Sequence, residues 1–494
     1  MIQYISGSQL SIEEFETPFN NSLLADNRWV MLSKVVNWDK FASLYISKMN
    51  LGFGRPGVSP RIVLGALIIK HKENLGDRDV IATIQENPYM QYFVGLSGFS
   101  TKPVFDPSLF VEIRKRIGAD DFDTLTVDLI QSISEKEDIK HNKKHKKEDE
   151  SPKNKGKMQA DATVADQMIA YPTDSNLLNI SRKKSEEVID KLYELSGKDG
   201  VKPKTYRNKI DKIFLSYSKK KSKPKKAHRK MNHLLLEAVN RNIKRVNKYL
   251  DNFKTFPLTF KEQQVLWIIT EVYRQQKEMF EAKKHSCSDR IVSIFQPHVR
   301  PIPRGKARAR VEFGSKLGVS LDDGFARIDT FSWDAYSEGK DLIKQIKNYK
   351  ELHGHYPEVV QVDKAYSTNE NRKWLKERGI RITAPPLGRK PKIQENAYQK
   401  RKKKKEAAER NHIEGKFGQG KNGYRLNQVR ARLKSTSESW VACIFFVMNL
   451  INYQKKVVFC AFFKLRSPVV NYWSIIIKAI ENEIYKNKVI LFNM

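Results

Sequence analysis

Three acidic residues stand in settings that suit chemistry on a phosphodiester. Asp161 lies in the middle of a stretch of strict polar–apolar alternation (residues 158–164), and Asp363 ends an apolar stretch (residues 359–363). Both patterns predict β-strands, while Glu414 lies in a segment that predicts a helix. Carboxylate oxygens are the ligands that Mg²⁺ prefers, and a pair of such ions can activate an attacking hydroxyl and stabilise the leaving oxygen at phosphorus. The alternative is three unrelated surface acids, with Asp161 exposed on an edge strand.

Cations and one aromatic residue recur around Glu414 with helical spacing. Arg410, Glu414, Phe417 and Lys421 occupy relative positions 0, 4, 7 and 11, which fall on one face of a helix. One acid is therefore held between two cations, an arrangement suited to presenting a metal-binding carboxylate to a polyanion. The same pattern occurs on ordinary solvated helices, and the three glycines of this segment lower its helix propensity.

The chain as a whole is strongly basic. Its 494 residues include 91 Lys and Arg against 56 Asp and Glu, a net charge of +35. A chain with this charge can neutralise the phosphates of a nucleic acid and release their counterions. The alternative is an unusually basic soluble protein. A membrane-surface role is disfavoured, because the cations are spread along the chain and do not line one amphipathic helix.

Cysteine usage and the most apolar stretch bear on where the protein works. Cys287, Cys443 and Cys460 are widely separated and form no CxxC pair, which fits a reducing cytoplasm. Asn, Gln and Lys residues interrupt the apolar stretch at residues 440–463. We therefore expect a core helix packed on the sheet there, and no membrane span.

The elements that would position the acids divide the chain into four parts. Short helical patterns with capping residues predict an all-α N-terminal domain over residues 1–130, either a DNA-binding unit of the helix-turn-helix kind or a helical scaffold without a DNA role. Nearly all-charged residues predict a linker over residues 131–157. Residues 158–460 predict an α/β mixed-sheet domain with a large helical insertion at about 173–285. Residues 461–494 are left as a divergent C-terminal tail.

Within the α/β part, period-two patterns predict further strands in residues 290–302, 309–321 and 325–333. The insertion contains a basic run at residues 219–230. We expect a solvated loop there, with contact to phosphates as its functional alternative.

Four blocks of the sequence resemble an insertion-sequence DDE transposase, specifically of the IS-five family. GALIIKHKENLGDRDVIATIQENPYMQYFVGL resembles that family's N-terminal transposase domain. QADATVADQMIAYPTDSNLLN and VVQVDKAYSTNENRKWLKERGIR resemble its first and second aspartate blocks, and RNHIEGKFGQGKNGY resembles its glutamate block. Together these blocks span most of residues 55–450.

The resemblance implies an RNase H-like catalytic core in which Asp161, Asp363 and Glu414 are the catalytic acids and the ligands of Mg²⁺, for which Mn²⁺ can substitute. It implies double-stranded DNA as the partner, at the element ends and at the target, and no small-molecule substrate. It also implies a homodimer in the synaptic complex and a cytoplasmic, nucleoid-associated location. Arg410 and Lys421 are expected to contact terminal phosphates, and Lys416 is expected to bind DNA beside them. The tyrosine expected three residues before the arginine is replaced by Ala407.

Trp333 is a further candidate for contact with DNA, and two other functions are alternatives to a transposase. Trp333, on the turn after a predicted strand, could stack on an unpaired base, or it could be a core or turn residue. A nuclease with the same metal site would lack strand transfer. A catalytically inactive, transposase-derived DNA-binding protein would keep the basic surface alone.

Overall fold

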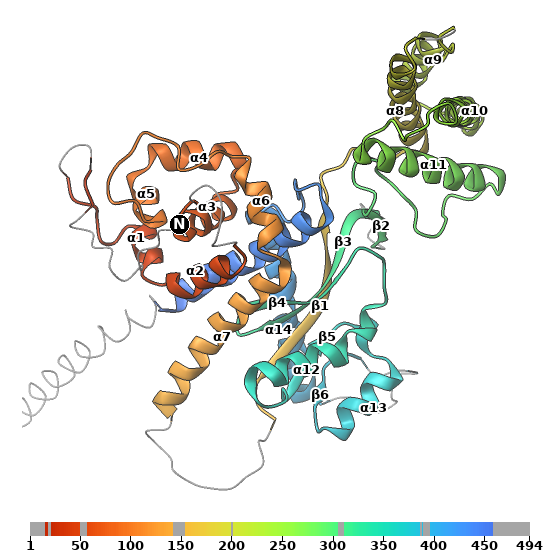
Figure 1. The fold of residues 1–494 in the computed structure, drawn as a ribbon. Coiled ribbons are helices and arrows are strands. Elements are labelled where there is room, and N and C mark those ends of the chain that lie inside the picture. Colours follow the sequence, from red (N-terminus) through yellow and green to blue (C-terminus); the bar gives the residue numbers. More distant parts are fainter. Residues whose placement is uncertain are drawn as a thin grey trace, which may run out of the picture.

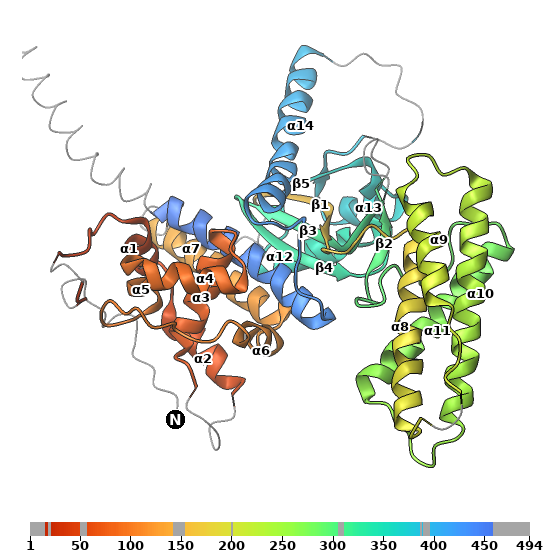
Figure 2. The same ribbon diagram turned by 90° about the horizontal axis from the view of Figure 1, so that it is seen from above.

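The structure of the protein is a computed structural model, in which the described residues are 15–17, 21–49, 57–141, 154–198, 201–304, 311–385, 388 and 396–457. Figure 1 shows a cluster of N-terminal helices, a central sheet with its own helices, and a helical bundle that stands apart from the N-terminal cluster. Seen from above in Figure 2, the sheet lies between the N-terminal helices on one side and the bundle on the other.

The N-terminal part is helical, as its capping signals predict. Ser59 is the N-cap of one helix with Pro60 at its first position, and Asn87 accepts the backbone N–H of Met90 at the start of another. The helices are α1 (Arg28–Ser33), α2 (Trp38–Ser47), α3 (Pro60–Lys72), α4 (Asp77–Glu86), α5 (Pro88–Val94), α6 (Leu109–Arg116) and α7 (Ala119–His141).

The charged linker expected from residue 131 is partly helical, because α7 continues to His141. Packed first turns provide the nucleus that a helix needs, and charged residues can then extend it in water. Residues 142–153 lie outside the described residues.

A mixed six-stranded sheet forms the centre of the molecule. Its order is β2-β3-β1-β5-β6, and β4 pairs with β3 off this path. β1, β5 and β6 are parallel, while β3 runs antiparallel to β1, β2 and β4. This arrangement is consistent with an RNase H-like core, so the predicted fold class is confirmed. The strands are β1 (Lys157–Asp166), β2 (Arg300–Pro303), β3 (Val311–Asp322), β4 (Phe325–Ser332), β5 (Val359–Val362) and β6 (Arg381–Ile382).

Helices cover both faces of this sheet. α12 (Leu342–His353) and α13 (Asn369–Glu377) pack on the face that carries Ala160 and Val362. Because side chains alternate along a strand, Gln159 and Asp161 point to the opposite face. α14 (Ala397–Gly418) lies on that face against β1 and β5.

The insertion between β1 and β2 is a bundle of four helices, α8 (Asp174–Leu195), α9 (Arg207–Lys219), α10 (Lys225–Leu250) and α11 (Phe260–Glu281), as the sequence predicts. The prediction of a strand over residues 290–302 was wrong except at the end of this segment, where β2 forms. The side chain of Gln275 accepts the backbone N–H of Ile291, and Pro297 has no N–H to give to a ladder, so this segment follows an irregular path.

The helix over residues 434–457 packs on the sheet, as expected, and also on the N-terminal helices. Phe446 contacts Phe41 of α2 with ring centroids 5.1 Å apart, and Asn449 bonds both backbone polar groups of Ala326 in β4. A single cluster of buried apolar side chains therefore runs from α2 through this helix to Val319 in β3. A helix that is apolar on all sides can fill such a junction.

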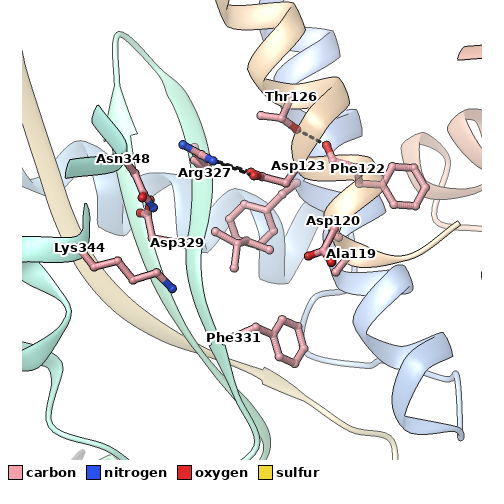
Figure 3. Close-up of a pocket in the computed structure, with 14 residues that line it drawn as sticks. Ala119, Asp120, Phe122, Asp123, Thr126, Arg327, Asp329, Phe331, Lys344 and Asn348 are labelled. Atoms are coloured by element: carbon pink, nitrogen blue, oxygen red, sulfur yellow. Dashed lines mark hydrogen bonds and ion pairs between the residues drawn. The ribbon is translucent and has the colours of Figure 1, made fainter. Parts of the chain in front are cut away.

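The same junction contains a cavity of about 390 Å³ between α7, β4, α12 and the C-terminal helix (Figure 3). Phe122 and Phe331 form part of its apolar wall, and Asp329 lines its polar side. Arg327 bridges the cavity edge to Asp123 of α7 through two hydrogen bonds of 2.9 and 2.8 Å.

Candidate active site

The two predicted strand acids come together on adjacent central strands, where β5 ends beside the middle of β1. In the parallel pairing of β1 with β5, Ala160 lies opposite Val362, so Asp161 and Asp363 follow directly at the same level. Asp161 is half-buried on β1, and its carboxylate accepts the N–H of Ala162 at 2.8 Å. Asp363 is exposed at the end of β5 and caps a short 3₁₀ turn by accepting the N–H of Lys364 at 2.5 Å.

Burial and neighbouring acids perturb the titration of Asp161. Burial raises the pKa of Asp161 to about 6, and the carboxylates of Glu338 and Asp363 add to the increase. The N–H of Ala162 and the charge of Arg410 oppose it. Glu338, which forms a 2.9 Å ion pair with Lys316, was missed by sequence reasoning. It lies in a short 3₁₀ helix between β4 and α12 that shows no periodic pattern, and only the fold brings it near Asp161.

A set of glutamine and glutamate contacts fixes α14 to the strands just before the acids. Gln159 precedes Asp161 by two residues, so both side chains point to the same face. Its Nε2 donates to the backbone oxygen of Glu409 at 2.7 Å and to Gln361 at 3.0 Å. Gln361 donates to the Glu409 carboxylate at 2.9 Å. These buried amides tie the helix to β1 and β5 together, and no local sequence pattern marks them.

The helical face expected around Glu414 is present for Arg410 and Glu414, whereas Lys421 lies beyond the end of α14 and pairs with other acids. α14 opens with a capping box between Asn396 and Gln399 and continues through Gly415 to Gly418 despite its glycines. Arg410 donates to Glu414 at 3.2 Å across one turn, and the Glu414 side chain is 55% exposed. Because the charge of Arg410 also acts on Asp161, this arginine relates the helix acid to the strand acids.

Lys421 follows α14 in a π-helical turn and contacts acids. Its Nζ lies 3.3 Å from Glu312 Oε1 and 3.8 Å from Asp166 Oδ2. Burial and the charge of Glu312 raise the pKa of Asp166 to about 6, while Lys421 opposes this rise. The lysine therefore lies between two carboxylates near the far end of β1.

Lys416 and Trp333, the other two residues expected to contact DNA, contact other parts of the protein. Lys416 points to the β3–β4 turn and donates to the Gly324 oxygen at 3.0 Å, and burial lowers its pKa to about 8. Trp333 is buried, packs edge-on against His298 with ring centroids 4.4 Å apart, and donates its Nε1–H to Glu438 at 2.7 Å. Trp333 is therefore a packed residue in this fold, which was the alternative to stacking on a base.

The carboxylates of Asp161 and Asp363 are suitable ligands for a divalent metal. Among the described residues, no group of three or more His, Cys, Asp or Glu side chains is gathered closely enough to hold a metal ion. The chemistry of Asp161 and Asp363 nevertheless fits Mg²⁺, since both offer carboxylate oxygens on adjacent strands. The unfavourable burial of Asp161 beside other acids is also the situation that a bound cation would relieve.

A mixed sheet with acids on adjacent parallel strands and on a packed helix is compatible with metal-assisted phosphoryl transfer. Residues 360–451 match the family described as a transposase DDE domain, and residues 18–116 match a transposase domain (DUF772). The first match includes Asp363 and Glu414 and begins after Asp161. Two separate segments of the chain are thus similar to transposase domains, and DDE transposases generally use a divalent metal.

Part of the chain is also similar to a curated protein. The chain is 28% identical over 148 residues to an uncharacterized protein, ORF8 in the nfe locus, of Rhizobium meliloti. The aligned part covers 30% of this chain and 66% of that protein. No solved structure matches the chain. Within the described residues, no helix combines the length and the apolar character that crossing a membrane requires.

Proposed function

We propose that the protein is a DNA transposase of the IS-five family that binds the terminal inverted repeats of its element and catalyses strand cleavage and strand transfer. The observation that carries this proposal is the adjacency of Asp161 and Asp363 on neighbouring central strands, beneath the helix that carries Arg410 and Glu414. The family matches and the net charge of +35 support DNA as the substrate.

In this proposal Asp161 and Asp363 would hold Mg²⁺, and Glu414 would be its third protein ligand. The bound metal supplies stabilisation of charge on the attacking and leaving oxygens of the phosphodiester. Arg410 holds the Glu414 carboxylate in place and presents the free part of its guanidinium to a phosphate. Gln159 and Gln361 keep the helix acid in register with the strand acids through Glu409. One active site uses the same acids for nicking and for joining the freed 3′-hydroxyl to target DNA, and two protomers act on two ends.

The test is cleavage of a labelled duplex carrying the end of the element, with Mg²⁺ and with EDTA. The parent protein should nick the end only with metal, and Asp161→Ala should abolish nicking while end binding persists. Asp334→Ala is the matched control, because this acid is 72% exposed on the turn after β4 and belongs to none of the contacts above.

The two alternatives give different results in the same assay. Tight end binding without nicking by the parent would favour a catalytically inactive DNA-binding protein. Nicking without joining of the 3′ end to a second duplex would favour a nuclease with the same metal site.

A further inference from the structure

One end of the helical bundle carries a concentrated positive charge. Residues 219–230, here called the basic end, comprise the end of α9, the connection 220–224 and the first turns of α10, and contain eight Lys and Arg and no acid. All eight of these cations are exposed. Seven of them are lysines, and the eighth, Arg229, packs on the Phe280 ring at 4.2 Å.

Some cations elsewhere in the bundle are paired with acids. Lys191 contacts Glu262 at 2.7 Å, and Arg274 contacts Glu271 at 2.6 Å. Across the part of the chain that the structure describes, no ion pair joins the basic end to an acid. Eight exposed cations within twelve residues, with no acid among them, create a local positive potential that attracts an anionic partner.

The basic end is held in a defined place relative to the active site. Tyr217 and His228 share a hydrogen bond of 2.7 Å, and Ser175 donates to Asn232 at 2.6 Å, which pins α9 and α10 to the start of α8. Residues 167–173 alone separate that start from β1. The basic end therefore lies at the end of the bundle that connects to β1. From Asp161, β1 runs toward this end of the bundle. Figure 2 shows the bundle beside the sheet.

We infer that the basic end is a binding surface for the phosphates of duplex DNA engaged at Asp161. The inference rests on the proposed function, because that function makes DNA the partner. Lysine ammonium groups on flexible stems act as point charges, so the contact would be independent of base sequence and would position the duplex. Each phosphate neutralised releases counterions and makes binding more sensitive to salt.

The experiment compares two variants that lose the same charge. One carries Lys→Gln at the basic end, at Lys219, Lys220, Lys221 and Lys223. The control carries Lys→Gln at four exposed lysines in the far half of the bundle, at Lys244, Lys248, Lys254 and Lys261. Affinity for a duplex carrying the element end and its flank is measured in EDTA between 50 and 200 mM salt, so that binding is separated from cleavage.

If all four lysines at the basic end contact phosphates, the slope of log affinity against log salt should fall by about 0.9 for each. Over this salt range the parent would then lose about 150-fold more affinity than the variant. The control should keep the parent's slope, and a Lys→Arg version of the four basic-end positions should restore it.

Equal slopes for the parent and the basic-end variant would overturn the inference, as would an equal loss in the control variant. Nicking is scored separately with Mg²⁺. A parent that never nicks, together with a slope lost only in the basic-end variant, would overturn the proposed activity and leave the surface standing.

Discussion

The buried carboxyl group of Asp329 should make the stability of the protein depend on pH. Its carboxyl group lies in the junction cavity, where Asn348 donates to Oδ1 at 2.8 Å (Figure 3). Burial raises its pKa from 3.8 to about 6, because a charged carboxylate loses its hydration there. The Asn348 bond and the charge of Arg327 only partly offset this rise.

The raised pKa means that the folded protein binds a proton which the unfolded chain has already released. Stability contributed by this group is complete below pH 3.8 and is lost as the pH rises through about 6. A difference of about two units corresponds to about 3 kcal/mol, at 1.36 kcal/mol per unit. Asp329→Asn resembles the protonated form and keeps the oxygen that accepts from Asn348. The variant should therefore be more stable than the parent by up to about 3 kcal/mol at pH 8, and equal to it at pH 4.

The assay is urea unfolding followed by tryptophan fluorescence at pH 4, 6 and 8. Trp440 belongs to the hydrophobic core that borders the cavity, so its emission reports on this junction. Asp334→Asn is the control, because it neutralises an exposed acid on the turn that follows β4. A variant that is no more stable than the parent at pH 8, or whose advantage is the same at all three pH values, would refute the reasoning.

Three other outcomes are expected. Asp363→Asn should bind end DNA as the parent does and lose cleavage by at least 100-fold, because it removes the negative charge of a proposed metal ligand without altering the basic surface. A gel-shift assay and a nicking assay check this, and full cleavage would refute it. Lys70 is 1% exposed and burial lowers its pKa to about 8, so the unfolding free energy should rise from pH 8 toward 10.5, and Lys70→Met should flatten that rise in pH-dependent unfolding. Gly314→Ala would place a Cβ 1.9 Å from the Ala165 oxygen and should cost about 1–3 kcal/mol, whereas Gly415→Ala has free space on α14 and should stabilise by up to about 1 kcal/mol in thermal unfolding.

The elements that carry the acids could be predicted because each depends on a local pattern. Alternation around Asp161 and the apolar run before Asp363 specify strands, since burial on one or both faces sets the sequence period. The i to i+4 spacing of Arg410 and Glu414 predicts their contact on α14 for the same reason.

The surroundings of the acids could not be predicted, because they depend on contacts between residues far apart in sequence. Glu338 reaches Asp161, and Gln159 reaches Glu409, only after the sheet has formed. The burial of Trp333 against His298 follows from the irregular segment that replaced an expected strand.

The sequence by itself determined the helical and strand segments, the mixed-sheet class and the positive charge, because periodicity, caps and composition act over a few residues. The tertiary structure decided how those segments share a core. The middle of the helix at residues 434–457 is apolar on nearly every side, so its sequence predicts burial but not the partner it packs against. In the tertiary structure it packs between α2 and β3, and so joins the N-terminal helices to the sheet that holds Asp161.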